Sequence, residues 1–138
     1  MSLFSRFFKK PAKATDDPVF GHITYEYGLW VYIPKPEATG FMVSVDASES
    51  GPAQSQRDFY LTICANLPEF EGRARDFMRS HADPDIDVSQ LSVYSIEIGS
   101  DEDCRRQDFV LEMCDKEAHL VHRISFSGKN AVDYGCDD

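Results

Sequence analysis

The sequence predicts a single α+β domain, in which an antiparallel sheet of β₃–α–β₃ order carries one kinked helix or a helix pair on one face. Apolar residues alternate with period two over residues 20–47, recur about every four residues over 53–80, and alternate again over 91–126. With 138 residues, the chain has the length of one domain that can bury its own core. We expect a leader and linker over residues 1–17 and the domain over 18–138.

The first part of the sheet is predicted as an antiparallel meander of three strands: residues 20–26, 29–34 and 41–47. Apolar residues keep to odd-numbered positions on both sides of Gly28, which offers a tight turn. If this odd face packs on the helices, Trp30 and Tyr32 point to the opposite face. Exposed Trp and Tyr are favoured anchors of protein interfaces, so both are predicted interface residues. The alternative is that they form ordinary cross-strand pairs or lie under a second cover.

A helical region follows the meander. Phe59, Ile63 and Leu67 recur every four residues, which is typical of one face of a helix. Pro68 cannot lie deep inside an uninterrupted helix, so we expect either two helices or one long helix kinked near this proline. The predicted helices cover residues 53–65 and 67–80.

Three further strands are predicted after the helices: residues 91–99, 108–114 and 120–126. Pro84 is the last proline of the chain, so every later residue keeps the N–H group that a strand ladder needs. The segment 99–107 is polar and is predicted as a turn. The tail 127–138 has no strong period.

The charge of the chain is divided unevenly. The net charge is −10, and all 24 acids lie after residue 13, whereas residues 1–13 carry Arg6, Lys9, Lys10 and Lys13. An acidic body repels phosphate backbones, so nucleic acid is not expected as a partner. It attracts a basic protein surface, which is the predicted partner. The alternative reading of the acidity is solubility alone.

Two acidic runs flank the predicted strand 91–99, and we include both among the candidate interface residues. They are Asp83, Asp85 and Asp87 on one side, and Asp101, Glu102 and Asp103 on the other. The first run resembles the opening of a calcium loop. Val88 and Tyr94, however, stand where such a loop needs Gly and Glu, so calcium is not expected.

Motifs for catalysis and cofactor binding are missing from the sequence. It contains no phosphate-binding loop, no H-E-x-x-H and no G-x-S-x-G. Five Cys and His residues have the chemistry of zinc ligands but not the spacing of a zinc motif: Cys104, Cys114, His119, His122 and Cys136. We therefore expect no cofactor and no metal. The main prediction is a non-enzymatic protein-binding module, and the alternative is a small ligand-binding domain or enzyme with a pocket between sheet and helices.

The first ten residues are basic and aromatic. If they were helical, Leu3, Phe4, Phe7 and Phe8 would share one face and Arg6, Lys9 and Lys10 the other. Contact with a membrane surface through residues 1–10 is one alternative role for this leader. The leader does not have the pattern of a secretory signal, so we expect a cytoplasmic protein with free cysteines.

A family resemblance covers about residues 18–127. It consists of an opening F-G-x-I-x-Y hairpin that includes Phe20 and Gly21, then Trp30, and a helical N-L-P-E that includes Leu67. In this architecture the chain resembles small uncharacterised bacterial α+β domains, some similar to immunity proteins found beside polymorphic toxins. The resemblance implies a cytosolic, non-enzymatic, protein-binding role, and it implies no site residue.

Overall fold

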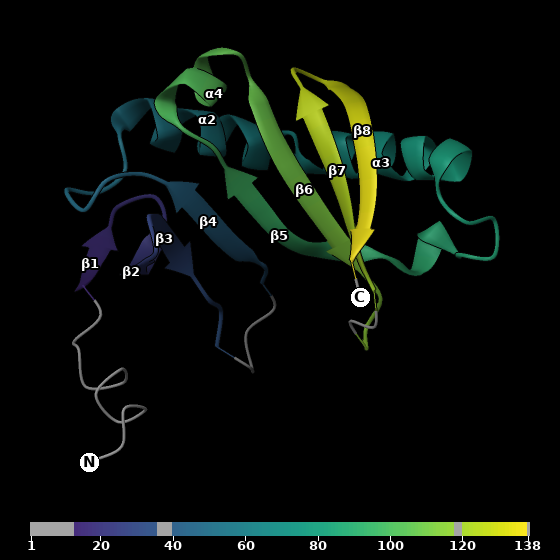
Figure 1. The fold of residues 1–138 in the computed structure, drawn as a ribbon, viewed down its shortest axis with the longest axis horizontal. Coiled ribbons are helices and arrows are strands. Elements are labelled where there is room, and N and C mark those ends of the chain that lie inside the picture. The colour runs from purple at the N-terminus through teal and green to yellow at the C-terminus, as the bar shows by residue number, and fades with distance from the viewer. Residues whose placement is uncertain (1–12, 36–39, 118–119, 138) are drawn as a thin grey trace.

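The computed structural model describes residues 13–35, 40–117 and 120–137 (Figure 1). They form one eight-stranded sheet, in which the strands lie side by side in sequence order. The strands are β1 (Lys13–Asp17), β2 (Gly21–Glu26), β3 (Leu29–Tyr32), β4 (Met42–Asp46), β5 (Ser92–Ile98), β6 (Asp108–Cys114), β7 (Val121–Ser127) and β8 (Asn130–Asp137). The helices are α2 (Gln54–Ala65), α3 (Leu67–His81), the short 3₁₀ helix η1 (Val88–Gln90) and α4 (Asp101–Arg105).

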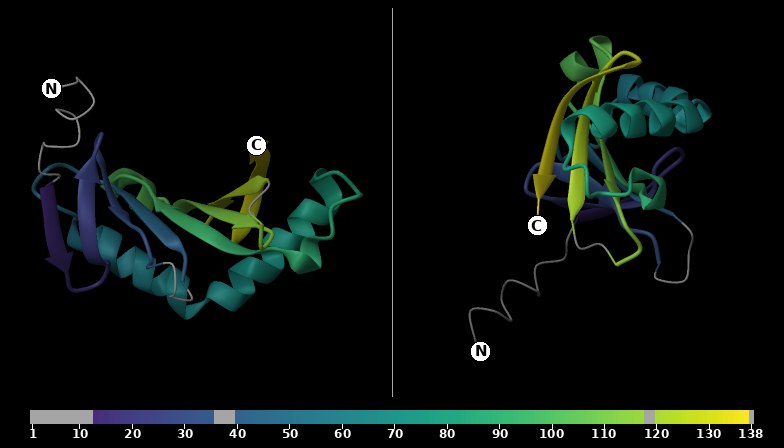
Figure 2. Two further views of the ribbon diagram at one scale, coloured as in Figure 1. Left: turned by 90° about the horizontal axis from the view of Figure 1, so that it is seen from below. Right: turned by 90° about the vertical axis from the view of Figure 1, so that its right-hand side faces the viewer.

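The predicted β₃–α–β₃ order and the all-antiparallel sheet are wrong, although the broad α+β class holds. Four strands precede the long helices and four follow them, and the sheet is mixed because β4 and β5 pair in parallel. The chain passes from β4 to β5 through α2, α3 and η1, the kind of crossover that parallel neighbours require. Both long helices lie on one face of the sheet (Figure 2).

Besides the short η1, three elements lie where no regular structure was predicted. Residues 13–17, expected in the linker, form β1, and the tail forms β8, which pairs with β7 over most of its length. The expected turn over 99–107 contains α4, whose first turn is capped by Ser100 and Asp103 in a capping box. The leader 1–10 lies outside the described residues. Among the residues that are described, no helix has the length and apolarity to cross a membrane.

The face of the sheet that carries α2 and α3, here called the covered face, holds the core. Phe109 and Phe126 stack with ring centroids 5.1 Å apart, and Phe70 of α3 meets both rings edge-on. Ile96 and Leu111 extend the same layer and are fully buried. No buried polar side-chain atom in the described part of the chain lacks a hydrogen-bond partner. The covered face is therefore filled and internally satisfied.

Trp30 belongs to this core, so the expectation that it points away from the helices is wrong. Its side chain is 1% exposed, and its indole N–H donates to the carbonyl of Ser48. The cause is the two-residue turn at Tyr27 and Gly28, both with positive φ. Across this turn Tyr25 pairs with Trp30, so the inward positions change from odd to even. Leu29 is consequently 39% exposed on the opposite face.

Gln56 fastens the start of α2 to two strand ends. Its side-chain Nε2 donates to the carbonyls of Asp46 (2.7 Å) and Gly99 (2.8 Å), and its Oε1 accepts from the backbone N–H of Ala53 (2.8 Å). The residue is 2% exposed, and all three of these bonds are made inside the protein. This clamp fixes the ends of β4 and β5 relative to each other, where the candidate site lies.

Candidate functional site

The face of the sheet opposite α2 and α3, here called the open face, has a mixed polar and apolar surface. Its central residues include Glu97 of β5, Val110 and Glu112 of β6, and Arg123 and Ser125 of β7. They alternate along the strands with the buried residues of the covered face. Among the described helices, none lies across this face (Figures 1 and 2).

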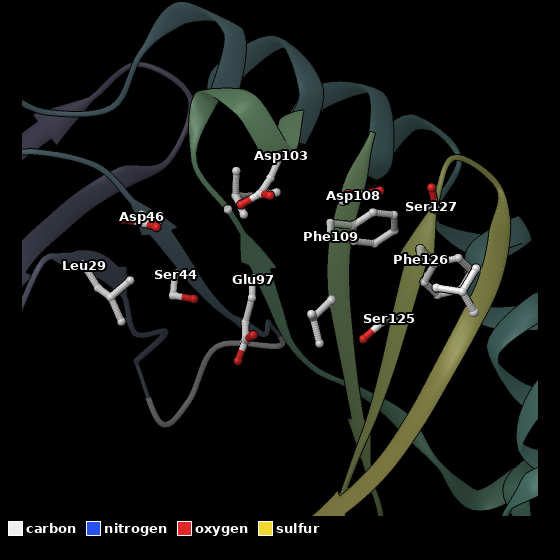
Figure 3. Close-up of a pocket in the computed structure, with 14 residues that line it drawn as sticks. Leu29, Ser44, Asp46, Glu97, Asp103, Asp108, Phe109, Ser125, Phe126 and Ser127 are labelled. Atoms are coloured by element: carbon white, nitrogen blue, oxygen red, sulfur yellow. The ribbon is translucent and has the colours of Figure 1, made fainter. Parts of the chain in front are cut away.

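A hollow of about 620 Å³ lies on the open face, at the end of the sheet where α4 joins β5 to β6 (Figure 3). We call it the acidic hollow, because four carboxylates line it and no Lys, Arg or His does. The carboxylates are Asp46, Glu97, Asp103 and Asp108. Three serines also line it, Ser44, Ser125 and Ser127, together with six apolar residues: Leu29, Ile98, Phe109, Val110, Phe126 and Val132.

The register of the sheet brings these residues together from distant parts of the chain. Asp46 ends β4 opposite Leu29, and Asp108 begins β6 opposite Ser127. Glu97 lies between them on β5, level with Ser44 on β4 and Val110 on β6. Residues that are level on neighbouring strands share a face, so the side chains converge on the same end of the open face.

Asp103 reaches the hollow from α4, and two contacts fix its carboxylate. Its Oδ2 accepts hydrogen bonds from the backbone N–H and the hydroxyl of Ser100, each 3.1 Å long. A Cβ atom at Gly99 would collide with this carboxylate, so glycine is required where the two meet. Asp103 therefore enters the hollow as a preorganised group rather than as a mobile surface acid.

A network of charges crosses β5, β6 and β7 beside the hollow. Arg123 binds both carboxylate oxygens of Glu97, at 2.7 and 2.8 Å, and one oxygen of Glu112 at 2.8 Å. The hydroxyl of Ser95 donates to the other oxygen of Glu112. The hydrogen bonds to Glu97, more than any other interaction, raise the pKa of Arg123. One fixed cation thus serves two carboxylates, and the network remains negative.

Asp46 and Asp108 have no such compensation. Within the described part of the chain, neither carboxylate takes part in an ion pair or a side-chain hydrogen bond. Both side chains can therefore accept hydrogen bonds from an incoming cation without breaking an internal contact. Ammonium and guanidinium groups are the natural partners of free carboxylates, and the apolar lining suits the aliphatic stem of a Lys or Arg side chain.

The geometry offers little to catalysis or metal binding. Among the described residues, no three His, Cys, Asp or Glu side chains gather in a way that could hold a metal ion. Cys104, Cys114 and Cys136 are free thiols on different elements, and His119 lies outside the described residues. Burial raises the pKa of the Cys104 thiol to about 11, and Asp101 and Asp103 add to this effect. A thiol of this kind is a poor nucleophile.

His122, the remaining predicted zinc candidate, is a core residue. It is 2% exposed on the covered face, and its Nδ1 lies 2.8 Å from the hydroxyl of Tyr134. Burial lowers the pKa of His122, against a smaller opposing effect of Asp115. Burial also raises the pKa of Tyr134 to about 12, with contributions from Cys136 and Asp83. The pair therefore keeps a neutral imidazole next to a protonated hydroxyl near neutral pH.

The predicted interface residues are scattered. Trp30 is buried and Tyr32 is half-buried, so neither forms an exposed aromatic anchor. Asp83, Asp85 and Asp87 precede β5, whereas Asp101, Glu102 and Asp103 lie on α4 after it. Asp101 and Glu102 pair with Arg105 and Arg106 of the same helix. Of the eight predicted residues, the hollow includes Asp103 alone.

Sequence reasoning missed the other carboxylates of the hollow, Asp46, Glu97 and Asp108. Each lies inside or at the end of a strand, where a charged residue interrupts an apolar alternation. That signal is present in the sequence, but it marks a shared site only after the pairing of β4 with β5 and of β5 with β6 is known. Comparison with known proteins adds no template, because the chain matches no family model, no curated protein and no solved structure.

Proposed function

We propose that the protein is a non-enzymatic, acidic protein-binding module whose open face holds a basic segment of another protein, as an immunity protein or inhibitor would. The observation that carries the proposal is the acidic hollow, with four carboxylates and no basic residue in its lining. We also propose a cytoplasmic location. The four free cysteines, none of them paired in a disulfide, support a reducing compartment.

Two physical features favour a protein segment over a simple cation. Leu29 and Val132 line the hollow and are 39% and 57% exposed, so they supply apolar contact beside the carboxylates. A basic peptide with interspersed apolar residues matches both kinds of surface. The net charge of −10 would also speed its approach at low ionic strength.

A ligand or active site between sheet and helices, the alternative function, has less support. Rings and aliphatic side chains fill that layer, among them Phe70, Phe109 and Met78. The large hollow lies on the other face of the sheet. A small cationic ligand in the hollow remains a second outcome of the experiment below.

The experiment is a titration of the ¹⁵N-labelled full chain with a synthetic nonapeptide of alternating Arg and Leu, followed by amide chemical shifts. We expect the largest shifts at open-face residues such as Ser44, Val110 and Ser125. The double variant Asp46→Asn/Asp108→Asn should weaken binding about tenfold, since it removes two charge-assisted contacts of about 0.7 kcal/mol each. Free arginine, titrated in parallel, reports on the small-ligand outcome.

The matched control is Asp58→Asn/Asp76→Asn, which changes the net charge equally on the exposed surfaces of α2 and α3. This variant should bind the nonapeptide like the wild type. Equal weakening by both double variants would reduce the effect to net charge and contradict the proposal. Shifts confined to the helices would contradict it as well.

A further inference from the structure

We propose that the basic leader of this chain, residues 1–10, docks on the open face of its own molecule and occupies the acidic hollow when no partner is bound. The inference uses the surface assigned under the proposed function, and it therefore rests on that face being a binding surface. It adds a specific occupant and a regulatory consequence. A partner would have to displace the leader before it could bind.

The first argument is where the described chain begins. Lys13 pairs with Tyr25 on β2, Tyr25 with Trp30 on β3, and Trp30 with Val45 on β4. Lys13 is thus one register position from the level of Leu29 and Asp46, which line the hollow. Figure 2 (left) shows that β1, in purple, starts on the side of the sheet away from the teal helices and runs toward them. The described chain thus begins at the end of the sheet that carries the hollow, on the side of the open face.

A direct contact agrees with this placement. The Nζ atom of Lys13 lies 4.0 Å from a carboxylate oxygen of Glu49, in the loop that follows Asp46. The last basic residue of the charged N-terminal segment therefore already pairs with an acid three residues after Asp46.

The length of the leader suffices. Neighbouring strands lie about 4.8 Å apart, so the four steps from β1 to β5 cover about 19 Å. Ten residues span about 15 Å as a helix and about 33 Å when extended. The extended segment can therefore reach Glu97 on β5, in the middle of the hollow, whereas a helical segment spans about three of the four steps and reaches only β4.

The leader contains both basic and apolar residues, which match the carboxylates and the apolar side chains of the hollow. The sequence places four apolar residues, Leu3, Phe4, Phe7 and Phe8, among three basic ones, Arg6, Lys9 and Lys10. The hollow offers unpaired carboxylates at Asp46 and Asp108 and exposed apolar side chains at Leu29 and Val132. An amphipathic basic segment with its own acidic, partly apolar face nearby has an intramolecular partner at high effective concentration.

The experiment is a photo-crosslink in the full chain, with the substitution Phe7→p-benzoylphenylalanine and mass-spectrometric mapping of the product. We expect crosslinks within one molecule to open-face peptides that contain Ser44, Val110 or Ser125. Raising NaCl from 0.05 to 0.5 M should lower the yield several-fold, because salt screens the charge contacts. Crosslinks to α2 or α3, crosslinks between two copies, or no crosslink to protein would each overturn the proposal.

Charge variants supply the control. Lys9→Glu/Lys10→Glu should lower the crosslink yield at least fivefold, and adding Asp46→Lys/Asp108→Lys should restore it. The matched variant Lys35→Glu/Lys116→Glu changes the charge equally at the other end of β3 and β6 and should leave the yield unchanged. Equal loss in the matched variant, or no restoration by the reversed pair, would contradict docking through these charges.

The nonapeptide titration separates this inference from the proposed function. If the leader competes, Lys9→Glu/Lys10→Glu should bind the nonapeptide several-fold more tightly than Lys35→Glu/Lys116→Glu, which has the same net charge. Equal affinities would overturn the leader proposal and leave the binding function standing. If the crosslinks hold but neither variant binds the nonapeptide at the open face, the proposed function fails instead.

Discussion

The two faces of the sheet are built from the same strands, yet one forms the core and the other forms the candidate binding surface. On β6, Phe109 and Leu111 are buried against the helices, whereas Val110 and Glu112 lie on the open face between them. The covered face is a layer of stacked rings with its polar atoms satisfied. The open face collects carboxylates, hydroxyl groups and half-exposed apolar side chains. The comparison teaches that fold stability and binding chemistry can occupy alternate residues of one strand.

The largest expected difference in the free energy of unfolding is between substitutions at two neighbouring residues of β6. Phe109→Ala should reduce the free energy of unfolding by about 3–5 kcal/mol, because it opens a cavity among Phe59, Phe70 and Phe126. Val110→Ala should cost about 1 kcal/mol or less, since Val110 is half-buried on the open face. Urea denaturation followed by circular dichroism measures both. Equal costs would remove the distinction between the faces.

The next effect concerns a buried ion pair at the end of β1. The carboxylate of Asp17 accepts from the N–H groups of Val19 and Phe20 and from Arg57. Burial alone would raise the pKa of Asp17, but the bonds to Arg57 and to the backbone outweigh it and lower the pKa. Asp17→Asn should cost about 3 kcal/mol near pH 7, because it leaves Arg57 without its partner.

The pH dependence of this pair provides the check. A lowered pKa in the folded state stabilises the fold above the usual pKa of 3.8, and this contribution is lost as the pH falls through and below that value. The difference in unfolding free energy between wild type and Asp17→Asn should therefore shrink between pH 5 and pH 2. A difference that stays constant over this range would show that the carboxylate charge is not what stabilises β1.

A smaller cost is expected from the ion network of the open face. Arg123→Gln leaves Glu97 and Glu112 close together without their shared cation and should cost about 1 kcal/mol, since all three side chains are in contact with solvent. Arg123→Lys keeps the charge but cannot bind both oxygens of Glu97 and should recover part of the loss. Chemical denaturation at 0.05 and 0.5 M NaCl tests this. A cost that does not decrease with salt would contradict an electrostatic origin.

The smallest expected effect is the pH dependence of stability that His122 contributes on the covered face. Because burial lowers the pKa of His122 below its usual 6.5, the unfolded chain binds the proton more readily. Stability should thus fall as the pH drops from about 6.5 toward the folded-state pKa. The variant His122→Gln should lack this component of the decrease. Thermal unfolding of both proteins between pH 7.5 and pH 5 measures it, and parallel curves would refute the assignment.

The long elements of the fold could be predicted from the sequence, but their pairing could not. The fourfold spacing through Phe59 and Ile63 predicts α2, and Pro68 marks the start of α3, as the structure has them. β1 and β8 were missed because both are edge strands with mostly exposed residues, so neither needs an apolar alternation. The parallel pairing of β4 and β5 follows from the crossover, which an alternation pattern does not reveal.

The candidate site was harder to predict than the fold, for a local reason. A tight turn of two residues at Tyr27 and Gly28 exchanges odd for even positions, and this places Trp30 inside and Leu29 outside. The acidic runs were visible in the sequence, but most of their charges pair locally, as Asp101 does with Arg105. The carboxylates that converge come from single positions on separate strands, which only the register brings together.

The parallel pairing of β4 with β5 also bears on how the protein folds. Every other strand pair in the described sheet joins neighbours in the chain through a short connection, so each of the two meanders can assemble from local contacts. The pairing of β4 with β5 can form only after the whole helical crossover between them is ordered, and this is the loop closure of greatest entropic cost in the described sheet. Residues from both sides of this strand pair line the acidic hollow. A nascent or half-folded chain therefore has no complete binding surface.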